Sequence, residues 1–318
     1  MPPSTEPNAD TSDAPATAAT SSASDGESTP QTVTPLMLRD WSLPSPGASK
    51  YDRGQIVVVG GDKRSPGAAL LAAEASLRVG AGRLTVAIAE SVAITAAVAL
   101  PESGVVLLPE TASGHIDGSR LDEAADDLSK ADAVLVGPGL DDAEQAAVLV
   151  AGLPEVVGGD AVVLLDAYAL AALPDSPSRD ALSGRLVLTP NLGEAASLLG
   201  QDDPLDAGSD DQLDAATLEI ARRYGAVVSC QARVAHPDGR LWRIGTGHGG
   251  LGTSGSGDVL AGAIAGLSAR GASREQAAVW ATHAHAAAGD RLAVAVGPLG
   301  FLASELLEEL PRVLVEIG

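Results

Sequence analysis

Apolar segments alternate along the chain with longer stretches rich in alanine and leucine. Six of these segments are short and rich in β-branched side chains, and most end at glycine, proline or an acid. Continuous apolar runs of this length are typical of strands buried on both faces of a parallel sheet. The six segments are QIVVVGG from residue 55, RLTVAIA from 83, DAVLVGPG from 132, AVVLLDA from 161, RLVLTPN from 185 and GAVVSC from 225. Their alternation with helix-like stretches predicts an α/β fold, a doubly wound and mostly parallel sheet with helices on both faces.

Glycine or polar residues follow five of the six predicted strands. In open parallel sheets, ligands bind just outside the carboxyl ends of the strands. Any one of these ends could be an ordinary tight turn, but five at one edge of a sheet predict a binding site. The five ends are Gly60-Gly61-Asp62, Gly137-Pro138-Gly139, Asp166-Ala167, Thr189-Pro190-Asn191 and Cys230-Gln231-Ala232.

The N-terminal segment has a different composition from the rest of the chain. Residues 1–34 consist mainly of Ser, Thr, Ala, Pro and Asp, and they contain five acids and no base. Such a segment buries too little apolar surface to fold, so we expect a disordered acidic tail that aids solubility. Residues 35–318 are expected to form a single domain, on which Leu38 and Trp41 dock the lead-in from 35 to 54.

Composition limits the classes of partner. Aromatic residues make up only 2% of the chain, so its core must be built from Ala, Val, Leu and Ile. The formal charge of −22 argues against binding to nucleic acid or to anionic membranes. Only three lysines occur, at positions 50, 63 and 130, so a phosphate site would depend on backbone N–H groups.

Cysteine usage and the absence of targeting signals favour the cytoplasm. Cys230 is the one cysteine, which rules out an internal disulfide and a cysteine metal cluster. The N-terminus has no secretory signal, and no uninterrupted apolar run approaches the ~18 residues of a membrane span.

The glycine-rich stretch GTSGSGDVLAG, residues 252–262, carries the clearest chemistry. Apolar residues recur from Leu260 at i+3, i+4 and i+7, which predicts a helix that runs to Gly271. The glycines therefore precede a helix N-terminus, where free N–H groups and the macrodipole bind anions. Asp258 falls in the first turn, either as a cap or as an acid or base beside a bound phosphate. The sequence lacks the Gly-Lys-Ser/Thr of a P-loop, and no strand directly precedes the glycines as a dinucleotide fingerprint requires.

GSGD at 255–258, followed by VLAGAIAGL, resembles the signature of the ribokinase-like superfamily. Over about residues 35–315 the chain is similar to the ADP-dependent (S)-NAD(P)H-hydrate dehydratases, which repair hydrated NADH and NADPH. The block SPGAALLAAEASLRVGAG from residue 65 discriminates this family, because sugar and vitamin kinases share GSGD without it. Further matches are VVVGGDKR, PES, ADAVLVGPGL, LLDAYAL, LTPNLGEAASLLG, HAHAAAGDRLA and LASELLEELP.

The resemblance implies a ribokinase-like fold and a repair lyase that uses ADP, or ATP, with Mg²⁺. Hydroxide is a poor leaving group, so phosphoryl transfer to the C6 oxygen of the hydrated ring precedes elimination of phosphate. The products are NAD(P)H, AMP and phosphate. The protein aligns the reactants and stabilises charge on the moving phosphoryl group.

Residue roles follow by the same resemblance. Asp258 would take the proton of the C6 hydroxyl, and Glu194 would organise Mg²⁺ and water around the phosphates. The residues implied to contact the hydrated nicotinamide nucleotide are Ala68, Gly139, Asn191 and Asp258. The residues implied to line the phosphate hole are Gly255, Ser256 and Gly257. The loop implied to hold the adenine nucleotide is Ser229, Cys230, Gln231, Ala232 and Arg233.

Two positions depart from the family pattern. Asn191 stands where the family usually has histidine, and its amide, unlike histidine, does not titrate near neutral pH. Together with Glu194 it forms the Asn-x-x-Glu pattern of the superfamily's kinases. The loop from Ser229 reads SCQARV, whereas the family usually reads like KGxxT. A phosphate-directed lysine is thus missing, and Arg233 is the candidate to replace it.

Other reactive residues point to no further site. His283 and His285 are two apart on a predicted helix and cannot share a face as a metal pair, although His285 matches a family histidine near the nucleotide. Cys230 has no assigned base that would make it a nucleophile. The acids between residues 202 and 211 are not spaced as in an EF-hand, so we expect a solvated acidic loop.

Two alternatives to the lyase stay open at this point. A small-molecule kinase acting on a vitamin or sugar alcohol would fit GSGD and the Asn191–Glu194 pattern. An inactive nucleotide-binding module would fit the altered loop at 229–233. By analogy with the superfamily we also expect a homo-oligomer. The companion epimerase is expected to be a separate protein, because only the tail precedes the domain.

Overall fold

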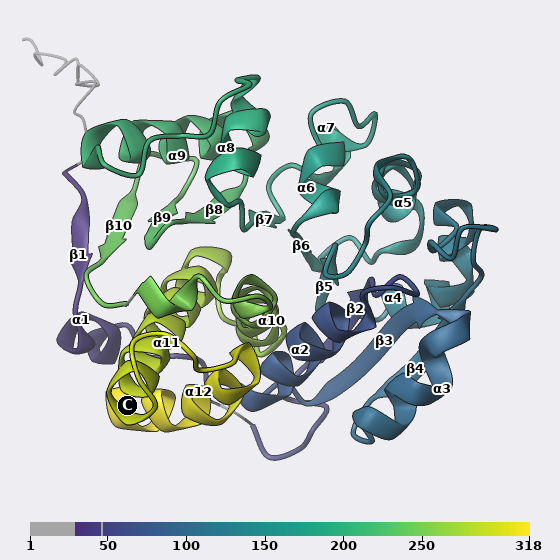
Figure 1. The fold of residues 1–318 in the computed structure, drawn as a ribbon, viewed down its shortest axis with the longest axis horizontal. Helices are drawn as coiled ribbons and strands as arrows, with labels where there is room; N and C mark the ends of the chain where they lie inside the picture. The colour runs from purple at the N-terminus through teal and green to yellow at the C-terminus, as the bar shows by residue number, and fades with distance from the viewer. Residues whose placement is uncertain (1–28, 46, 248) are drawn as a thin grey trace, which may run out of the picture.

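One ten-stranded sheet runs through the computed structural model, which describes residues 29–45, 47–247 and 249–318 (Figure 1). The strand order across the sheet is β1-β10-β9-β8-β7-β6-β5-β2-β3-β4. Strand β9 is antiparallel to both of its neighbours, and every other neighbouring pair in this sheet is parallel. The strands are β1 (Gln31–Val33), β2 (Gln55–Val59), β3 (Arg83–Ala89), β4 (Gly104–Leu108), β5 (Ala133–Val136), β6 (Val162–Leu165), β7 (Leu186–Leu188), β8 (Val227–Cys230), β9 (Arg233–Ala235) and β10 (Leu241–Ile244).

The predicted doubly wound α/β fold is confirmed. The six apolar segments form β2, β3, β5, β6, β7 and β8, and each of these strands is almost wholly buried. The sequence pattern did not predict β1, β4, β9 and β10. Two of these strands are only three residues long, and β4 is partly exposed at one edge of the sheet, so their apolar patterns are weak.

Helices cover both faces of the sheet (Figure 1). Alternate strand residues point to opposite faces, so Ile56 and Val58 join one core while Val57 and Val59 join the other. Against the first face lie α1 (Pro35–Asp40), α2 (Pro66–Arg78), α3 (Glu90–Ala99), α10 (Ser256–Ala269), α11 (Arg274–Ala295) and α12 (Ala303–Ile317). Against the second lie the 3-10 helix η1 (Gly118–Ala124) and the helices α4 (Ala125–Leu128), α5 (Ala143–Val156), α6 (Tyr168–Ala172), α7 (Arg179–Leu182), α8 (Leu192–Leu199) and α9 (Asp210–Tyr224).

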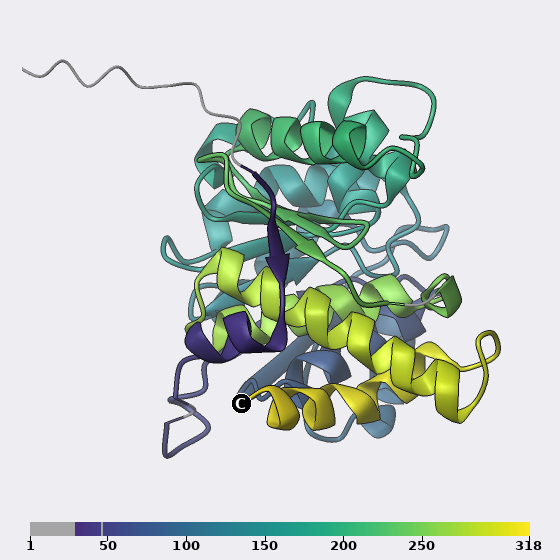
Figure 2. The same cartoon turned by 90° about the vertical axis from the view of Figure 1, so that its left-hand side faces the viewer.

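The expected tail over residues 1–34 is wrong at its C-terminal end. Gln31–Val33 form β1, which pairs in parallel with β10 at the edge of the sheet (Figure 2). Val33 is buried, and Thr34 caps α1 by accepting the Met37 N–H at 3.2 Å. The unpaired edge of β10 provides the partner, which composition alone does not show. Residues 1–28 of the predicted tail lie outside the described residues.

The lead-in docks on the domain as predicted. Leu38 is fully buried, and the rings of Trp41 and Trp242 stack with their centroids 5.8 Å apart. The indole N–H of Trp280 donates to the Trp41 carbonyl at 2.9 Å. Within the described part of the chain, no helix has both the length and the apolar character that a bilayer crossing requires.

The five predicted strand ends lie side by side. Strands β8, β7, β6, β5 and β2 are consecutive neighbours in the sheet, and all five are parallel. Their carboxyl ends therefore share one edge, and the residues that follow them can form one site.

Candidate active site

The glycine-rich stretch ends in a tight turn at the start of α10. Gly255 is the N-cap residue and has a φ of +89°, a conformation that favours glycine. An added Cβ there would come 2.6 Å from Cδ1 of Leu71 on α2, so a side chain would also collide. The predicted helix is confirmed, although it ends at Ala269, two residues before the expected Gly271.

The predicted phosphate hole divides into an open part and a buried part. Gly257 is exposed, and an added Cβ would meet nothing within 4 Å, so a ligand can approach its backbone. Ser256 is buried, and its N–H already donates to the Thr253 carbonyl at 3.2 Å. First-turn N–H groups have no partner within their own helix, so those of Gly257 and Asp258 are available to an anion.

Asp258 stands in the first turn beside these donors. Burial raises the pKa of its carboxyl to about 6, and Gly255, not Asp258, is the helix cap. A carboxylate with a pKa just below neutral is ionised enough to take a proton and basic enough to hold it. The arrangement therefore suits Asp258 to general acid–base chemistry.

Asp166, directly after β6, is a functional candidate whose role the sequence alone does not predict. Its buried side chain accepts a hydrogen bond from Thr189 Oγ1 at 2.7 Å. Burial, together with the nearby charges of Asp258 and Glu194, raises its pKa to about 7. The signal that could have found it is an acid placed directly after a buried strand. The next residue, Ala167, has a φ of +50°, and such strain often accumulates at functional sites.

Asn191 and Glu194 form a capping box at the start of α8. Asn191 Oδ1 accepts the N–H groups of Gly193 and Glu194, both at 2.9 Å, and Glu194 Oε2 accepts the Asn191 N–H at 2.8 Å. The Asn-x-x-Glu pattern thus has a structural role. What Asn191 can still offer a ligand is its amide N–H₂ group, and Glu194 keeps a half-buried carboxyl whose pKa burial raises.

Two further acids act on Asp166 at this edge of the sheet, because the charges of Asp258 and Glu194 both contribute to its raised pKa. Burial is the main cause of the raised pKa of Asp166, the two charges add to it, and a divalent cation bound at Asp166 would favour its ionised form. A donor set made only of oxygen suits a hard ion such as Mg²⁺. Within the described residues, however, the ligand atoms of these three acids do not all lie within 4.8 Å of one another, so Glu194 as the organiser of Mg²⁺ stays a prediction that rests on its chemistry.

Gly139 and the start of α2 lie against each other. Gly139 has a φ of +75°, and an added Cβ would come 2.3 Å from the Ser65 carbonyl oxygen. Ser65 precedes α2 and donates its hydroxyl to the Gly139 carbonyl at 3.1 Å. Since Ala68 lies in the first turn of α2, the structure brings the two predicted substrate contacts together.

The loop predicted to hold the adenine nucleotide is the tight turn of the β8–β9 hairpin. Gln231 and Ala232 have φ values of +46° and +60° and form its tip. Ser229 is buried and its hydroxyl lies 2.9 Å from Thr282 Oγ1. Burial raises the pKa of the Cys230 thiol to about 12, which disfavours the thiolate that a nucleophile needs. Gln231 and Ala232 are thus the accessible part of this loop.

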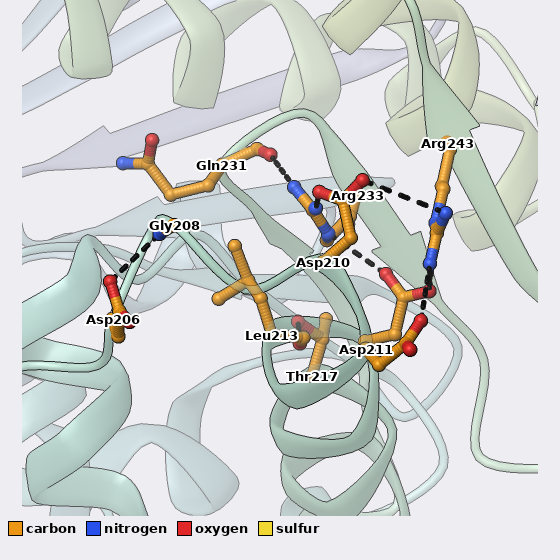
Figure 3. Close-up of polar contacts among 10 residues, drawn as sticks. Asp206, Gly208, Asp210, Asp211, Leu213, Thr217, Gln231, Arg233 and Arg243 are labelled. Atoms are coloured by element: carbon orange, nitrogen blue, oxygen red, sulfur yellow. Dashed lines mark hydrogen bonds and ion pairs between the residues drawn. The ribbon is translucent and has the colours of Figure 1, made fainter.

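Arg233 does not present its charge to a ligand (Figure 3). Its Nε donates to Asp214 Oδ1 at 2.8 Å, its Nη1 to the Gln231 carbonyl at 2.9 Å, and its Nη2 to Asp210. Arg243 also donates to Asp214, so the arginines and the acids of α9 form one ion-pair network. The expectation that Arg233 replaces the missing lysine is therefore wrong, because these acids hold its guanidinium. Figure 3 shows the Gln231 side chain pointing away from this network.

A family profile described as NAD(P)H-hydrate dehydratase matches residues 56–312. The chain belongs to the NAD(P)H-hydrate dehydratase family. The profile covers both the GSGD motif and the discriminating block from residue 65, so the resemblance seen in the sequence is confirmed.

Relatives in this family extend over most of the chain. The ADP-dependent (S)-NAD(P)H-hydrate dehydratase of Xanthomonas campestris is 44% identical over 291 residues, which cover 89% of this chain and 96% of the relative. The bifunctional NAD(P)H-hydrate repair enzyme Nnr of Escherichia coli is 33% identical over 281 residues, 87% of this chain and 50% of the relative. The chain thus spans about half the length of the bifunctional members.

Solved structures agree with the family's fold. The ADP/ATP-dependent NAD(P)H-hydrate dehydratase of Bacillus subtilis, co-crystallized with ATP/Mg²⁺, matches with a TM-score of 0.72 and 26% identity, covering 92% of this chain and 100% of that one. A ribokinase-like superfamily protein from Enterococcus faecalis matches with a TM-score of 0.73 and 19% identity, covering 91% of this chain and 96% of that one. The predicted ribokinase-like fold is confirmed.

Proposed function

We propose that the protein dehydrates the S form of hydrated NADH or NADPH at the expense of ADP, giving NAD(P)H, AMP and phosphate. The observation that carries this proposal is the 44% identity, over nearly the full length of both chains, to the ADP-dependent (S)-NAD(P)H-hydrate dehydratase of Xanthomonas campestris. The site supports it, because an anion-binding helix N-terminus and a carboxyl with a raised pKa stand side by side.

The reaction proceeds in two stages. Asp258 accepts the proton of the C6 hydroxyl as that oxygen attacks the terminal phosphorus of ADP. The bond from this phosphorus to the bridging oxygen breaks and AMP leaves. The C6–O bond then breaks with departure of phosphate, and loss of a proton from C5 restores the double bond of the nicotinamide ring.

Each part of the site has a role in these stages. The N–H groups of Gly257 and Asp258, with the α10 dipole, stabilise the negative charge that spreads over the transferring phosphoryl group. Asp166 and Glu194 would hold Mg²⁺, which when bound neutralises phosphate charge. Gly139, Ala68 and the Asn191 amide would position the hydrated ring.

Further properties belong to the proposal. The Bacillus subtilis relative is named ADP/ATP-dependent, so ATP is a second candidate phosphoryl donor. We expect the tip of the β8–β9 turn to contact the adenine nucleotide, and the protein to act as a homo-oligomer in the cytoplasm. The epimerase that interconverts the hydrate epimers is expected on a separate chain.

The test is recovery of the NADH absorbance when the full chain is incubated with purified hydrated NADH, ADP and Mg²⁺. Turnover that also releases AMP supports the lyase. Binding of the hydrate without turnover would instead support an inactive module. ATP consumption with a vitamin or sugar alcohol, and none with the hydrate, would support the kinase that the Asn191–Glu194 pattern suggested.

A further inference from the structure

Three separate segments of the chain are hydrogen-bonded to one another next to Gly139. They are the loop after β2, the connection between β4 and η1, and the loop after β5. The N–H of Asp62 donates to the Gly139 carbonyl at 2.9 Å, and Lys63 N–H donates to the Gly114 carbonyl at 3.1 Å. The Asp62 carboxylate accepts the N–H groups of Ile116 at 2.7 Å and Asp141 at 2.9 Å. Asp62 thus holds all three segments together.

His115 lies at the centre of this junction. Its Nδ1 is 3.3 Å from Asp62 Oδ2 and is also hydrogen-bonded to Asp141 Oδ1, so one ring nitrogen bridges two carboxylates. Its Nε2 lies 4.0 Å from Asp142 Oδ2. The side chain of His115 is only 19% exposed and that of Asp62 only 2%, so water screens these contacts weakly.

The charges at this junction favour a protonated imidazole. Burial by itself would lower the pKa of His115, but the hydrogen bonds and charges of Asp141 and Asp62 outweigh it, and the pKa is raised. Burial raises the pKa of Asp62. Lys63 brings a further positive charge to the junction, since its side chain lies against Gly114. Without the His115 proton, the carboxylates of Asp62 and Asp141 would repel each other.

A bound metal is a poorer explanation of the same cluster. The ligand atoms of Asp62, His115 and Asp141 lie within 4.8 Å of one another. However, both oxygens of Asp62 already accept backbone N–H groups, and Nδ1 already bonds both carboxylates. The atoms that could bind a metal are therefore already engaged in hydrogen bonds. We call the hydrogen-bonded group of Asp62, His115 and Asp141 the clasp.

We propose that His115 is a positioning residue for the dinucleotide substrate. By joining Asp62 to Asp141 it holds the loop after β5 in place and keeps Gly139 against the start of α2. This proposal rests on the proposed function, in which Gly139 and Ala68 contact the hydrated nucleotide. A residue that acts in this way affects substrate binding more than the chemical step.

The first test compares kinetics of His115→Ala, His115→Asn and a matched control. We expect His115→Ala to raise the KM for hydrated NADH about tenfold, the loss expected for a hydrogen bond to a charged group, with kcat within about twofold. The Asn amide can place an N–H near the position of Nδ1, so His115→Asn should recover most of the KM. The control is His236→Ala, since His236 is similarly buried and also pairs with an aspartate, but at the β9–β10 turn. It should leave both constants unchanged.

The pH dependence separates positioning from simple packing. Protonated His115 holds the two carboxylates together. Because its pKa is raised, this stabilisation is complete at low pH and is lost as the pH rises through that pKa. The wild-type KM should therefore increase at a pH above the ordinary histidine pKa of 6.5, while the KM of His115→Asn stays flat. An unchanged KM in His115→Ala, or a wild-type KM without this rise, would overturn the proposal.

A readout without turnover keeps the proposal separate from the proposed function. Hydrogen exchange of the Asp141 amide, which the clasp protects, should be about tenfold faster in His115→Ala than in the wild type or in His115→Asn. If the wild type failed to dehydrate hydrated NADH, the proposed function would fall while this measurement still tested the clasp. Equal exchange in His115→Ala and the wild type would refute the clasp itself.

Discussion

Ser256 and His285 join the first turn of α10 to α11. His285 Nε2 lies 3.0 Å from the Ser256 hydroxyl and 3.0 Å from the Ser256 carbonyl oxygen. Burial lowers the pKa of His285 to about 4, so its ring is neutral at neutral pH and its Nε2–H donates to this turn. A hydrogen bond from α11 thus stabilises the turn that carries Gly257 and Asp258.

His285→Ala should destabilise the protein by about 1–3 kcal/mol, because it leaves a buried Ser256 hydroxyl without its partner. His285→Gln should cost less, since its amide N–H₂ can reach the place of Nε2–H. Urea unfolding followed by tryptophan fluorescence measures both free energies. Equal losses in the two variants would show that packing, and not the hydrogen bond, matters here.

His285 also predicts the direction of the pH dependence of stability. Its folded pKa, about 4, lies below the ordinary histidine value of 6.5, so the unfolded chain binds the proton more readily. The wild type should therefore lose stability as the pH falls from about 6.5 towards 4, by up to about 1.4 kcal/mol per pH unit from this group. In His285→Gln this part of the acid sensitivity should disappear. Unfolding free energies measured for both proteins across that range give the comparison.

Asp258→Asn should lower kcat by at least about 10²-fold, because the amide cannot accept the C6 hydroxyl proton. NADH recovery from the hydrate with saturating ADP measures the loss. Turnover at the wild-type rate would remove Asp258 from the mechanism.

The same substitution should stabilise the fold. Burial disfavours the ionised Asp258 carboxyl, and its folded pKa of about 6 lies above the ordinary aspartate value of 3.8. The penalty is present above pH ~6 and absent below ~4, so the amide should add about 1–2 kcal/mol at mildly alkaline pH and little near pH ~4. A variant that is both inactive and less stable would point instead to damage of the α10 turn.

Glu194→Gln and Asn191→Ala should separate the two roles of the α8 capping box. Gln can still accept the Asn191 N–H, so Glu194→Gln should change stability by less than about 0.5 kcal/mol while weakening activation by Mg²⁺ about tenfold. Asn191→Ala removes the cap and should cost about 1 kcal/mol. Thermal unfolding and Mg²⁺ titration of the activity provide the two readouts. An unchanged Mg²⁺ requirement in Glu194→Gln would contradict the role of Glu194 as the organiser of the metal.

Arg233→Met should reduce stability by about 3 kcal/mol or more, because it leaves the buried Asp214 with less compensation. It should leave the KM for ADP within about twofold, since the guanidinium pairs with α9 and not with a phosphate. Measurements well below the melting temperature of the variant keep the two effects apart. A large rise in the ADP KM with little loss of stability would restore Arg233 to the nucleotide site.

The sequence was informative where the signal is local. A buried strand such as β2 is an unbroken apolar run in the sequence, and the glycines before Asp258 predict a helix N-terminus. The strand β1 has no such signal, because two exposed residues and one buried valine become a strand only when β10 offers an open edge. Asp166 carried a signal, an acid at a strand end, but its importance depends on charges that distant segments bring close.

By itself, the sequence determined the α/β fold class, the shared edge of five strand ends, the motif residues from Gly255 to Asp258, and the family. Tertiary structure decided which of these groups are free to act. In the folded chain, Arg233 pairs with the acids of α9, and Ser256 is hydrogen-bonded to His285. His115 links Asp62 to Asp141. The physical reason is that hydrogen-bond partners, burial and pKa depend on neighbours dozens of residues away, whereas strand and helix patterns depend on neighbours along the chain.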